Sequence, residues 1–197
     1  MRPKKIDQSL IIQASLALLE ESNVKSFSIR KLADKLAVKG ASLYWHVKNK
    51  DELLCLIADY LSQKVEYPNP RLSCEVQLKV LFSHFRDVLL THKNSAYVFI
   101  ETPPVHPNRV ELISKVSELL VQFGLPEEKV FSAAWMLNNY VISFVTEEYR
   151  LEEVNDKPKE SIDDLNLPFN LAKFNTQKEF DFGLEVILNG LKQECLK

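Results

Sequence analysis

The spacing of apolar residues, over long stretches that contain almost no glycine, most constrains the fold of this chain. Only four glycines occur in 197 residues. Between the prolines, apolar side chains recur every three or four positions, which is the period of an amphipathic α-helix. The alternation of apolar and polar residues that predicts β-strands is nearly absent. We therefore expect an all-α protein.

The same periodicity, together with the residues that interrupt it, predicts nine helices. Ser28 and Asn49 are suitable N-caps for the second and fourth helices, and Pro68 and Pro70 end the fourth. The predicted helices cover residues 6–22, 28–36, 40–46, 50–66, 73–92, 95–101, 107–122, 127–149 and 176–195. The acidic, proline-containing segment 151–170 is predicted to be a long loop.

Charge is unevenly distributed along the chain, although the formal net charge is only −2. Residues 1–66 carry 11 Lys and Arg against 8 Asp and Glu, whereas residues 67–197 carry 14 against 19. This asymmetry predicts a basic head that contacts a polyanion and a slightly acidic body with another role. We therefore expect two domains, a basic head with its connecting helix at 1–66 and a body at 67–197.

The cysteines and the apolar segments indicate the compartment. Cys55, Cys74 and Cys195 are odd in number and far apart, so free thiols in a reducing cytoplasm are expected. The apolar stretch at 10–19 is interrupted by polar residues and fits a helix face better than an export signal. No apolar run approaches the roughly 20 residues of a membrane-spanning helix. We expect a cytoplasmic protein without a membrane partner.

The predicted helices 28–36 and 40–46 have the spacing of a helix-turn-helix. Leu43 is the one apolar anchor of the second helix, so its other side chains face outward or sideways. Small residues at its start allow the backbone to approach base edges in the major groove, and Arg30 can reach a guanine. The expected DNA-binding residues are Ser28, Arg30, Lys39, Gly40, Ala41, Ser42, Tyr44, Trp45, His46, Lys48 and Lys50. For Trp45, packing against the first helix remains an open alternative.

Two segments of the head resemble the DNA-binding domain of the tetracycline repressor (TetR) family. They are Ser-Ile-Arg-Lys-Leu-Ala-Asp-Lys-Leu at 28–36 and Ala-Ser-Leu-Tyr-Trp-His-Val-Lys-Asn-Lys at 41–50. The resemblance implies an all-helical homodimer whose heads bind a palindromic DNA operator. It also implies that the bodies hold a small effector and dimerise through a four-helix bundle.

The head also departs from the family pattern. Lys39, Gly40 and Ala41 stand where the tetracycline-binding members have Glu, Gln and Pro, and these positions select the DNA sequence. A different operator is therefore expected. Phosphate contacts from Tyr44, His46 and Lys50 are expected to persist.

The resemblance extends to the body and implies a ligand pocket. The expected pocket residues are Leu81, Phe85, Phe99, Thr102, Pro103, Trp135, Asn138 and Glu147. Family members that bind a drug–magnesium chelate have a metal-ligating His at the position of Phe99 and an Asn at that of Leu81. An apolar ring cannot ligate a hard cation. We therefore expect an unidentified effector, with no metal, no cofactor and no tetracycline.

The helices at 127–149 and 176–195 are apolar around much of their circumference, which favours neighbours on two sides. Packing against a second copy would form a four-helix interface. The expected dimer contacts are Phe131, Trp135, Ile142, Leu184, Ile187, Leu188 and Leu191.

Together, these features predict a one-component transcriptional regulator, with repression as the expected sign and release from DNA by a small molecule. The alternative is a ligand-independent architectural DNA-binding protein with the same head. Such a protein would discriminate weakly between sequences and bind with a steep salt dependence. An enzyme is disfavoured, because the sequence shows neither a nucleophile–base motif nor a glycine-rich phosphate loop.

Overall fold

The computed structural model describes residues 6–22, 24–155 and 175–196, and within these ranges the chain forms nine helices and no strand. The all-α prediction is confirmed. The helices are α1 (Gln8–Glu21), α2 (Ile29–Leu36), α3 (Gly40–Leu43), α4 (Lys50–Gln63), α5 (Cys74–Leu90), α6 (Ser95–Glu101), α7 (Pro107–Gln122), α8 (Glu127–Asn155) and α9 (Thr176–Glu194). None of these helices has the length and apolar character needed to cross a membrane.

The largest departure from the predicted boundaries is at the end of α8. This helix continues to Asn155, so the first five residues of the predicted loop 151–170 are helical. The prolines of that segment, Pro158 and Pro168, stand beyond these five residues, so nothing in 151–155 itself prevents a helix. The remainder of the predicted loop lies outside the described residues.

The predicted helix caps are present. Ser28 Oγ accepts a hydrogen bond from the backbone N–H of Lys31 at 3.3 Å, and Asn49 Oδ1 accepts one from the N–H of Glu52 at 2.8 Å. Each cap satisfies a donor that a helix N-terminus would otherwise leave unpaired. These side chains therefore fix where α2 and α4 begin.

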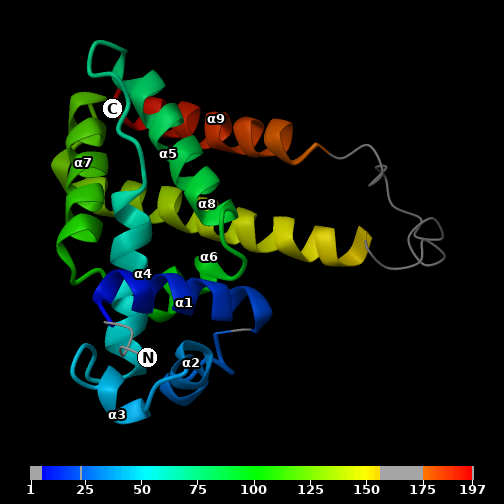
Figure 1. The fold of residues 1–197 in the computed structure, drawn as a ribbon. Coiled ribbons are helices and arrows are strands. Elements are labelled where there is room, and N and C mark those ends of the chain that lie inside the picture. Colours follow the sequence, from blue (N-terminus) through cyan, green and yellow to red (C-terminus); the bar gives the residue numbers. More distant parts are fainter. Residues whose placement is uncertain (1–5, 23, 156–174, 197) are drawn as a thin grey trace.

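Figure 1 shows α1, α2 and α3 gathered at one end of the molecule, with α4 running from there into the body. Leu32 of α2 and Leu43 of α3 are fully buried in this head. In the body, α5, α7 and α8 pack against one another, and α9 packs on α8. The head is thus a small helical layer, and α4 connects it to a larger helical body.

Helix α4 belongs to both parts, because it packs on α1 in the head and on α6 and α7 in the body. Asp59 of α4 fixes the second contact. Its Oδ1 accepts hydrogen bonds from the backbone N–H groups of Asn108 at 2.8 Å and Arg109 at 3.1 Å. Its Oδ2 accepts one from the side chain of Asn108 at 2.6 Å. Asp59 therefore caps the N-terminus of α7 from a neighbouring helix.

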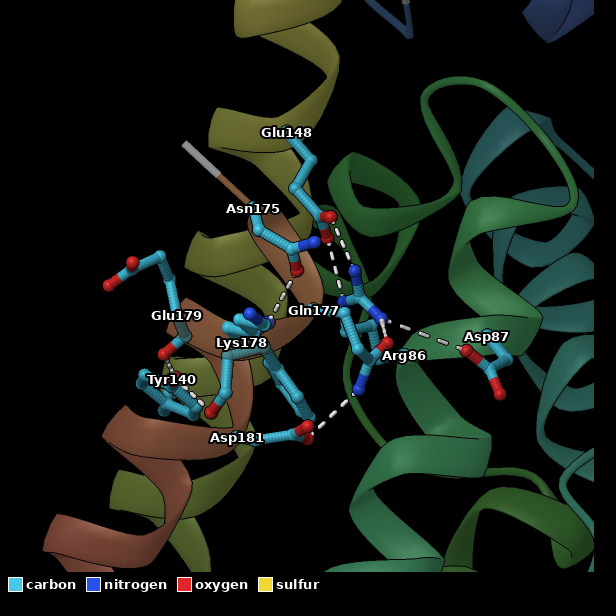
Figure 2. Close-up of polar contacts among 10 residues, drawn as sticks. Arg86, Asp87, Tyr140, Glu148, Asn175, Gln177, Lys178, Glu179 and Asp181 are labelled. Carbon is cyan, nitrogen blue, oxygen red and sulfur yellow. Dashed lines mark hydrogen bonds and ion pairs between the residues drawn. The ribbon is translucent and has the colours of Figure 1, made fainter. Parts of the chain in front are cut away.

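A buried ion pair joins α5, α8 and α9 within the body. Figure 2 shows the guanidinium of Arg86 directed at Glu148, with Nε 2.8 Å and Nη2 2.5 Å from the two carboxylate oxygens. Nη1 of Arg86 donates to Gln177 of α9 at 2.7 Å. The guanidinium also lies over the Phe180 ring, 5.0 Å from its centroid. The buried charge of Arg86 is tolerated because Glu148 neutralises it and Gln177 accepts a further hydrogen bond from it.

Candidate nucleic-acid interface and ligand cavity

Backbone conformation and hydrogen bonds at the end of α2 determine the turn between α2 and α3. Helix α2 is capped at its C-terminus by Ala37, which has φ of 54° in the left-handed region. Its N–H donates to Asp34 O at 3.1 Å, and the N–H of Val38 donates to Ala33 O at 3.0 Å. This pair of bonds turns the chain sharply at the end of α2. The next helix therefore begins three residues later, at Gly40.

Helix α3 is shorter than the predicted helix 40–46. It ends at Leu43, and the N–H of His46 then donates to Leu43 O at 2.9 Å, three residues back. Such a bond is typical of the tighter turn that often closes a helix. Leu43 remains the buried anchor, as expected, and Tyr44, Trp45 and His46 lie on a turn.

Most of the predicted DNA-binding side chains are exposed on this face of the head. Tyr44 is 58% exposed and Trp45 is 89% exposed. The alternative that Trp45 packs against α1 is therefore wrong. Arg30, Lys39, Ala41, His46 and Lys48 are also exposed, and Ser28, Gly40, Ser42 and Lys50 are partly buried. Contact of these residues with DNA stays a prediction.

Two of the predicted contacts already have partners within the protein. Lys50 Nζ donates to the carbonyl of Val24 at 2.7 Å, so one of its three N–H groups is used in the head. Ser28 Oγ is the N-cap of α2. Both side chains help to position the motif, in addition to the DNA contact predicted for them.

A cavity of about 380 Å³ lies between α5, α6, α7 and α8 in the body. Its volume and largely apolar lining are typical of a site for a small organic molecule. Phe85 and Phe99 meet edge to face in its wall, with ring centroids 5.2 Å apart. Five of the eight predicted pocket residues line it, namely Leu81, Phe85, Phe99, Trp135 and Asn138.

The other three predicted pocket residues do not line the cavity. The hydroxyl of Thr102 donates to Val98 O at 2.6 Å, so it is used within the protein. Pro103 is exposed, and the adjacent Pro104 reaches the cavity instead. Glu147 is exposed and pairs with Arg150. One residue along a helix rotates a side chain by about 100°, so the neighbouring acid, Glu148, is the one turned inward.

Sequence reasoning missed the polar centre of the cavity, Arg109, which is only 8% exposed. Its Nη1 donates to Thr102 O at 2.9 Å and Thr102 Oγ1 at 2.7 Å, and its Nη2 donates to Phe99 O at 3.1 Å. Its guanidinium lies over the Phe99 ring, 4.7 Å from the centroid. Burial lowers the pKa of Arg109 below its ordinary value. The available signal was its spacing with Leu112 and Val116, which places it on the buried face of α7.

The remaining lining residues, besides Arg109, are apolar apart from one amide. They are Phe82, Ile100, Pro104, Leu112, Ile113, Val116, Phe131, Ala134, Asn139 and Ile142. Within the described part of the chain, no three His, Cys, Asp or Glu side chains come close enough to hold a metal ion.

Four of the seven predicted dimer contacts on α8 and α9 need correction, and dimer contact by Phe131, Trp135 and Ile187 stays a prediction. Ile142, Leu184, Leu188 and Leu191 are buried within the protomer, because they face the body rather than solvent. Ile187 is partly buried. Phe131 and Trp135 are exposed, stack with ring centroids 6.2 Å apart and line the cavity.

Among the described side chains of these two helices, the other large apolar ones that are exposed are Met136, Phe182 and Val186. A helix that packs on its own body can show a partner only its opposite face. The residues that remain available to a partner therefore lie on a different face of their helix from most of the predicted dimer contacts.

An exposed helix-turn-helix, joined through one helix to a body with an apolar cavity, defines a class of helical DNA-binding regulators. Residues 11–55 match the family of bacterial regulatory proteins described as tetR, and residues 69–195 match the tetracyclin repressor-like C-terminal domain. The chain belongs to the TetR family of transcriptional regulators, as the resemblance of its head implied.

Individual relatives agree with this assignment. The HTH-type transcriptional regulator of Saccharopolyspora erythraea is 33% identical over 144 residues, which are 73% of this chain but only 61% of that protein. The tetracycline repressor protein class G of Vibrio anguillarum is 28% identical over 200 residues, covering 96% of this chain and 95% of that protein. The solved structure of ActR, a TetR family protein of Streptomyces coelicolor, in complex with actinorhodin superposes with a TM-score of 0.81. It shares 26% identity and covers 98% of this chain and 100% of its own.

Proposed function

We propose that this protein is a one-component transcriptional repressor, which binds a palindromic operator as a homodimer and is released from it by a small-molecule effector. The proposed division of labour places DNA binding in residues 1–66 and effector binding and dimerisation in residues 67–197. The recognition segment from Arg30 to Lys50 would read base edges with its exposed side chains and grip phosphates on either side.

The observation that carries the regulatory part is the contact of Asp59 with α7. Asp59 lies on α4, which packs on the head, and it caps α7 at Asn108 and Arg109. Arg109 in turn lines the cavity. A ligand that moves the first turn of α7 therefore moves α4, and with α4 the head. Its effect on DNA binding equals its differential affinity for the two arrangements, and about 3 kcal/mol corresponds to roughly 150-fold.

The relatives support an effector for this cavity. A tetracycline repressor aligns with almost the whole chain, and ActR of similar fold has been solved with actinorhodin bound. The cavity of this chain, about 380 Å³ and walled by aromatic rings, has room for a molecule of drug size. Its lining differs from that expected for a metal–drug chelate, because Phe99 offers no ligand atom.

Selection of bound duplexes from a random DNA library, at roughly physiological salt, tests the DNA-binding part. We expect the purified protein to enrich one palindrome with half-site centres about 34 Å apart, one turn of the double helix. The double variant Arg30→Ala, Tyr44→Ala is expected to lose the enrichment. Arg71→Ala is the matched control, because this exposed arginine lies outside the head and is expected to leave selection unchanged.

Retention of DNA without sequence enrichment, with a steep salt dependence, would contradict the repressor and favour the ligand-independent architectural protein. Once an operator is known, release can be measured directly by fluorescence anisotropy across a panel of metabolites and drugs. Unchanged operator affinity across that panel would contradict effector control.

A further inference from the structure

The cavity contains one charged side chain. Among the lining residues in the described part of the chain, Arg109 alone carries a charge, and the other polar side-chain groups are the amides of Asn138 and Asn139 and the indole N–H of Trp135. The remaining lining residues are apolar, with the aromatic rings of Phe85, Phe99 and others around the guanidinium. A purely apolar ligand would fill this cavity without interacting with its single positive charge.

No carboxylate in the described part of the chain pairs with the guanidinium of Arg109. The contrast with Arg86 is direct, because Arg86 directs Nε and Nη2 at both oxygens of Glu148. Asp59 accepts a hydrogen bond from the backbone N–H of Arg109, but its other bonds come from the backbone and side chain of Asn108, and none comes from the guanidinium. The one buried arginine is neutralised by an acid of its own, and the other is not.

The hydrogen bonds of Arg109 leave donors available. A guanidinium has five N–H groups, and those of Arg109 to Thr102 and Phe99 use three. Nε–H and one N–H of Nη2 have no acceptor among the described residues. All three acceptors are neutral oxygens, so they hold the guanidinium in place without balancing its charge.

Burial of a guanidinium without a counter-ion is costly for the protein. A charge removed from water without a counter-ion is strongly destabilised, and the lowered pKa of Arg109 reflects the same desolvation. Arginine nevertheless remains protonated in proteins near neutral pH. A ligand that brings a negative charge to this site therefore gains an interaction that the protein itself does not supply.

We propose that the cavity binds an aromatic carboxylic acid, whose carboxylate is held by the guanidinium of Arg109 and whose rings lie against the aromatic wall. A carboxylate is planar and accepts two parallel N–H bonds from arginine, which suits the free Nε and Nη2 donors. Asn138 and Asn139 are available to further oxygens of the same ligand. The assignment of such an acid as the effector rests on the proposed function. Its binding to the cavity is measured without DNA.

The test uses two probes of nearly the same shape, the anionic 2-naphthoic acid and the neutral 2-naphthamide, titrated into the full-length protein at neutral pH by isothermal titration calorimetry. We expect the acid to bind at least about tenfold more tightly than the amide, because a charge-assisted pair replaces a neutral contact. Equal affinities, or no binding of either probe, would overturn the proposal. This comparison needs no variant, so it cannot fail through misfolding.

The variants then locate the effect. Arg109→Gln removes the charge and keeps a donor for the carbonyls, and we expect the acid-to-amide ratio to fall to about 1. Arg109→Lys keeps the charge and is expected to retain part of the preference. Arg150→Gln, at an exposed arginine of α8, is the matched control with an unchanged ratio. A preference that persists in folded Arg109→Gln would also overturn the proposal.

The two proposals can fail separately. If the acid binds through Arg109 but never weakens operator binding, then the ligand class is right and effector control by such acids is wrong. If the operator is bound and released by neutral compounds while naphthoic acid does not bind, then the repressor is right and the ligand class is wrong.

Discussion

At the scale of single residues, the head depends on the left-handed conformation of Ala37. Its φ of 54° and ψ of 44° are disfavoured for a residue with a Cβ, by roughly 1–2 kcal/mol. The cost is tolerated because this conformation lets Ala37 and Val38 donate to the last carbonyls of α2. The angle between α2 and α3 is therefore maintained against a local preference.

Replacement of Ala37 by Gly is expected to stabilise the protein by about 0.5–1 kcal/mol. The relief of strain is partly offset by the greater entropy of glycine in the unfolded chain. The free energy of unfolding in urea measures the change. Ala17→Gly, inside α1, is the control and is expected to destabilise by about 1 kcal/mol. Equal losses in both variants would show that Ala37 is not strained.

A second prediction at this scale concerns the buried pair of Arg86 and Glu148. Arg86→Met leaves a buried carboxylate without its partner, and we expect a loss of about 3–5 kcal/mol in the free energy of unfolding. The double variant Arg86→Met, Glu148→Met is expected to recover most of it. Arg150→Met, which breaks an exposed pair, should change stability by less than about 1 kcal/mol. A double variant no more stable than Arg86→Met would contradict this account.

At the scale of secondary-structure elements, the side chain of Tyr140 on α8 lies directly against Gly183 of α9. A Cβ on this residue would lie 2.3 Å from Tyr140 Oη, which is too short for a contact between two non-bonded atoms. Tyr140 is held there because its hydroxyl donates to Phe180 O at 2.7 Å and its ring stacks on that of Phe180, 5.4 Å between centroids. The absence of a side chain at 183 thus leaves the space that the Tyr140 ring and hydroxyl occupy between the two helices.

Gly183→Ala is therefore expected to destabilise the protein by about 1–3 kcal/mol, because Tyr140 must move and give up its contacts. Gly190→Ala, two turns further along α9, meets nothing within 4 Å. There the higher helix propensity of alanine is expected to stabilise by about 1 kcal/mol. Thermal unfolding of the two variants gives the comparison. Stabilisation by both substitutions would show that the helices are not in close contact at Gly183.

At the scale of the whole molecule, the proposed homodimer depends on the apolar side chains that the protomer exposes. Phe182 is 67% exposed and Val186 is 53% exposed, and they lie one turn apart on α9. Exposed apolar residues that share a helix face favour an interface over solvent. The symmetric arrangement of two such faces would bring two heads onto one side of the DNA.

Phe182→Glu with Val186→Glu is expected to convert the dimer to a monomer, because it places charges in an apolar interface. Analytical ultracentrifugation measures the mass, and operator binding is expected to weaken in parallel, since one head alone makes half of the contacts. Val110→Glu, at an exposed apolar position of α7, is the control and should leave the dimer intact. A double variant that remains dimeric would place the interface elsewhere.

The sequence alone determined the number and order of the helices in the described part of the chain, the caps of α2 and α4, and the head, but not the ends of α3 and α8. These features are local, because helical periodicity, N-cap side chains and turn spacing act over a few residues. Within the cavity, sequence reasoning found the aromatic residues Phe85 and Phe99 but not Arg109. It also chose Glu147 where Glu148 is the buried acid. Adjacent residues on a helix have almost the same sequence neighbours, so local patterns do not show which of the two faces the body.

Only the tertiary structure decided which faces of the long helices are covered. The packing of α9 on α8 buries Leu184 and Leu188 and leaves Phe182 exposed, although all three are apolar. It likewise places Arg109 within the body, while the carboxylate of Asp59 is used by the backbone of α7. Burial and charge pairing depend on residues far apart in the sequence, so they exist only once the helices have packed.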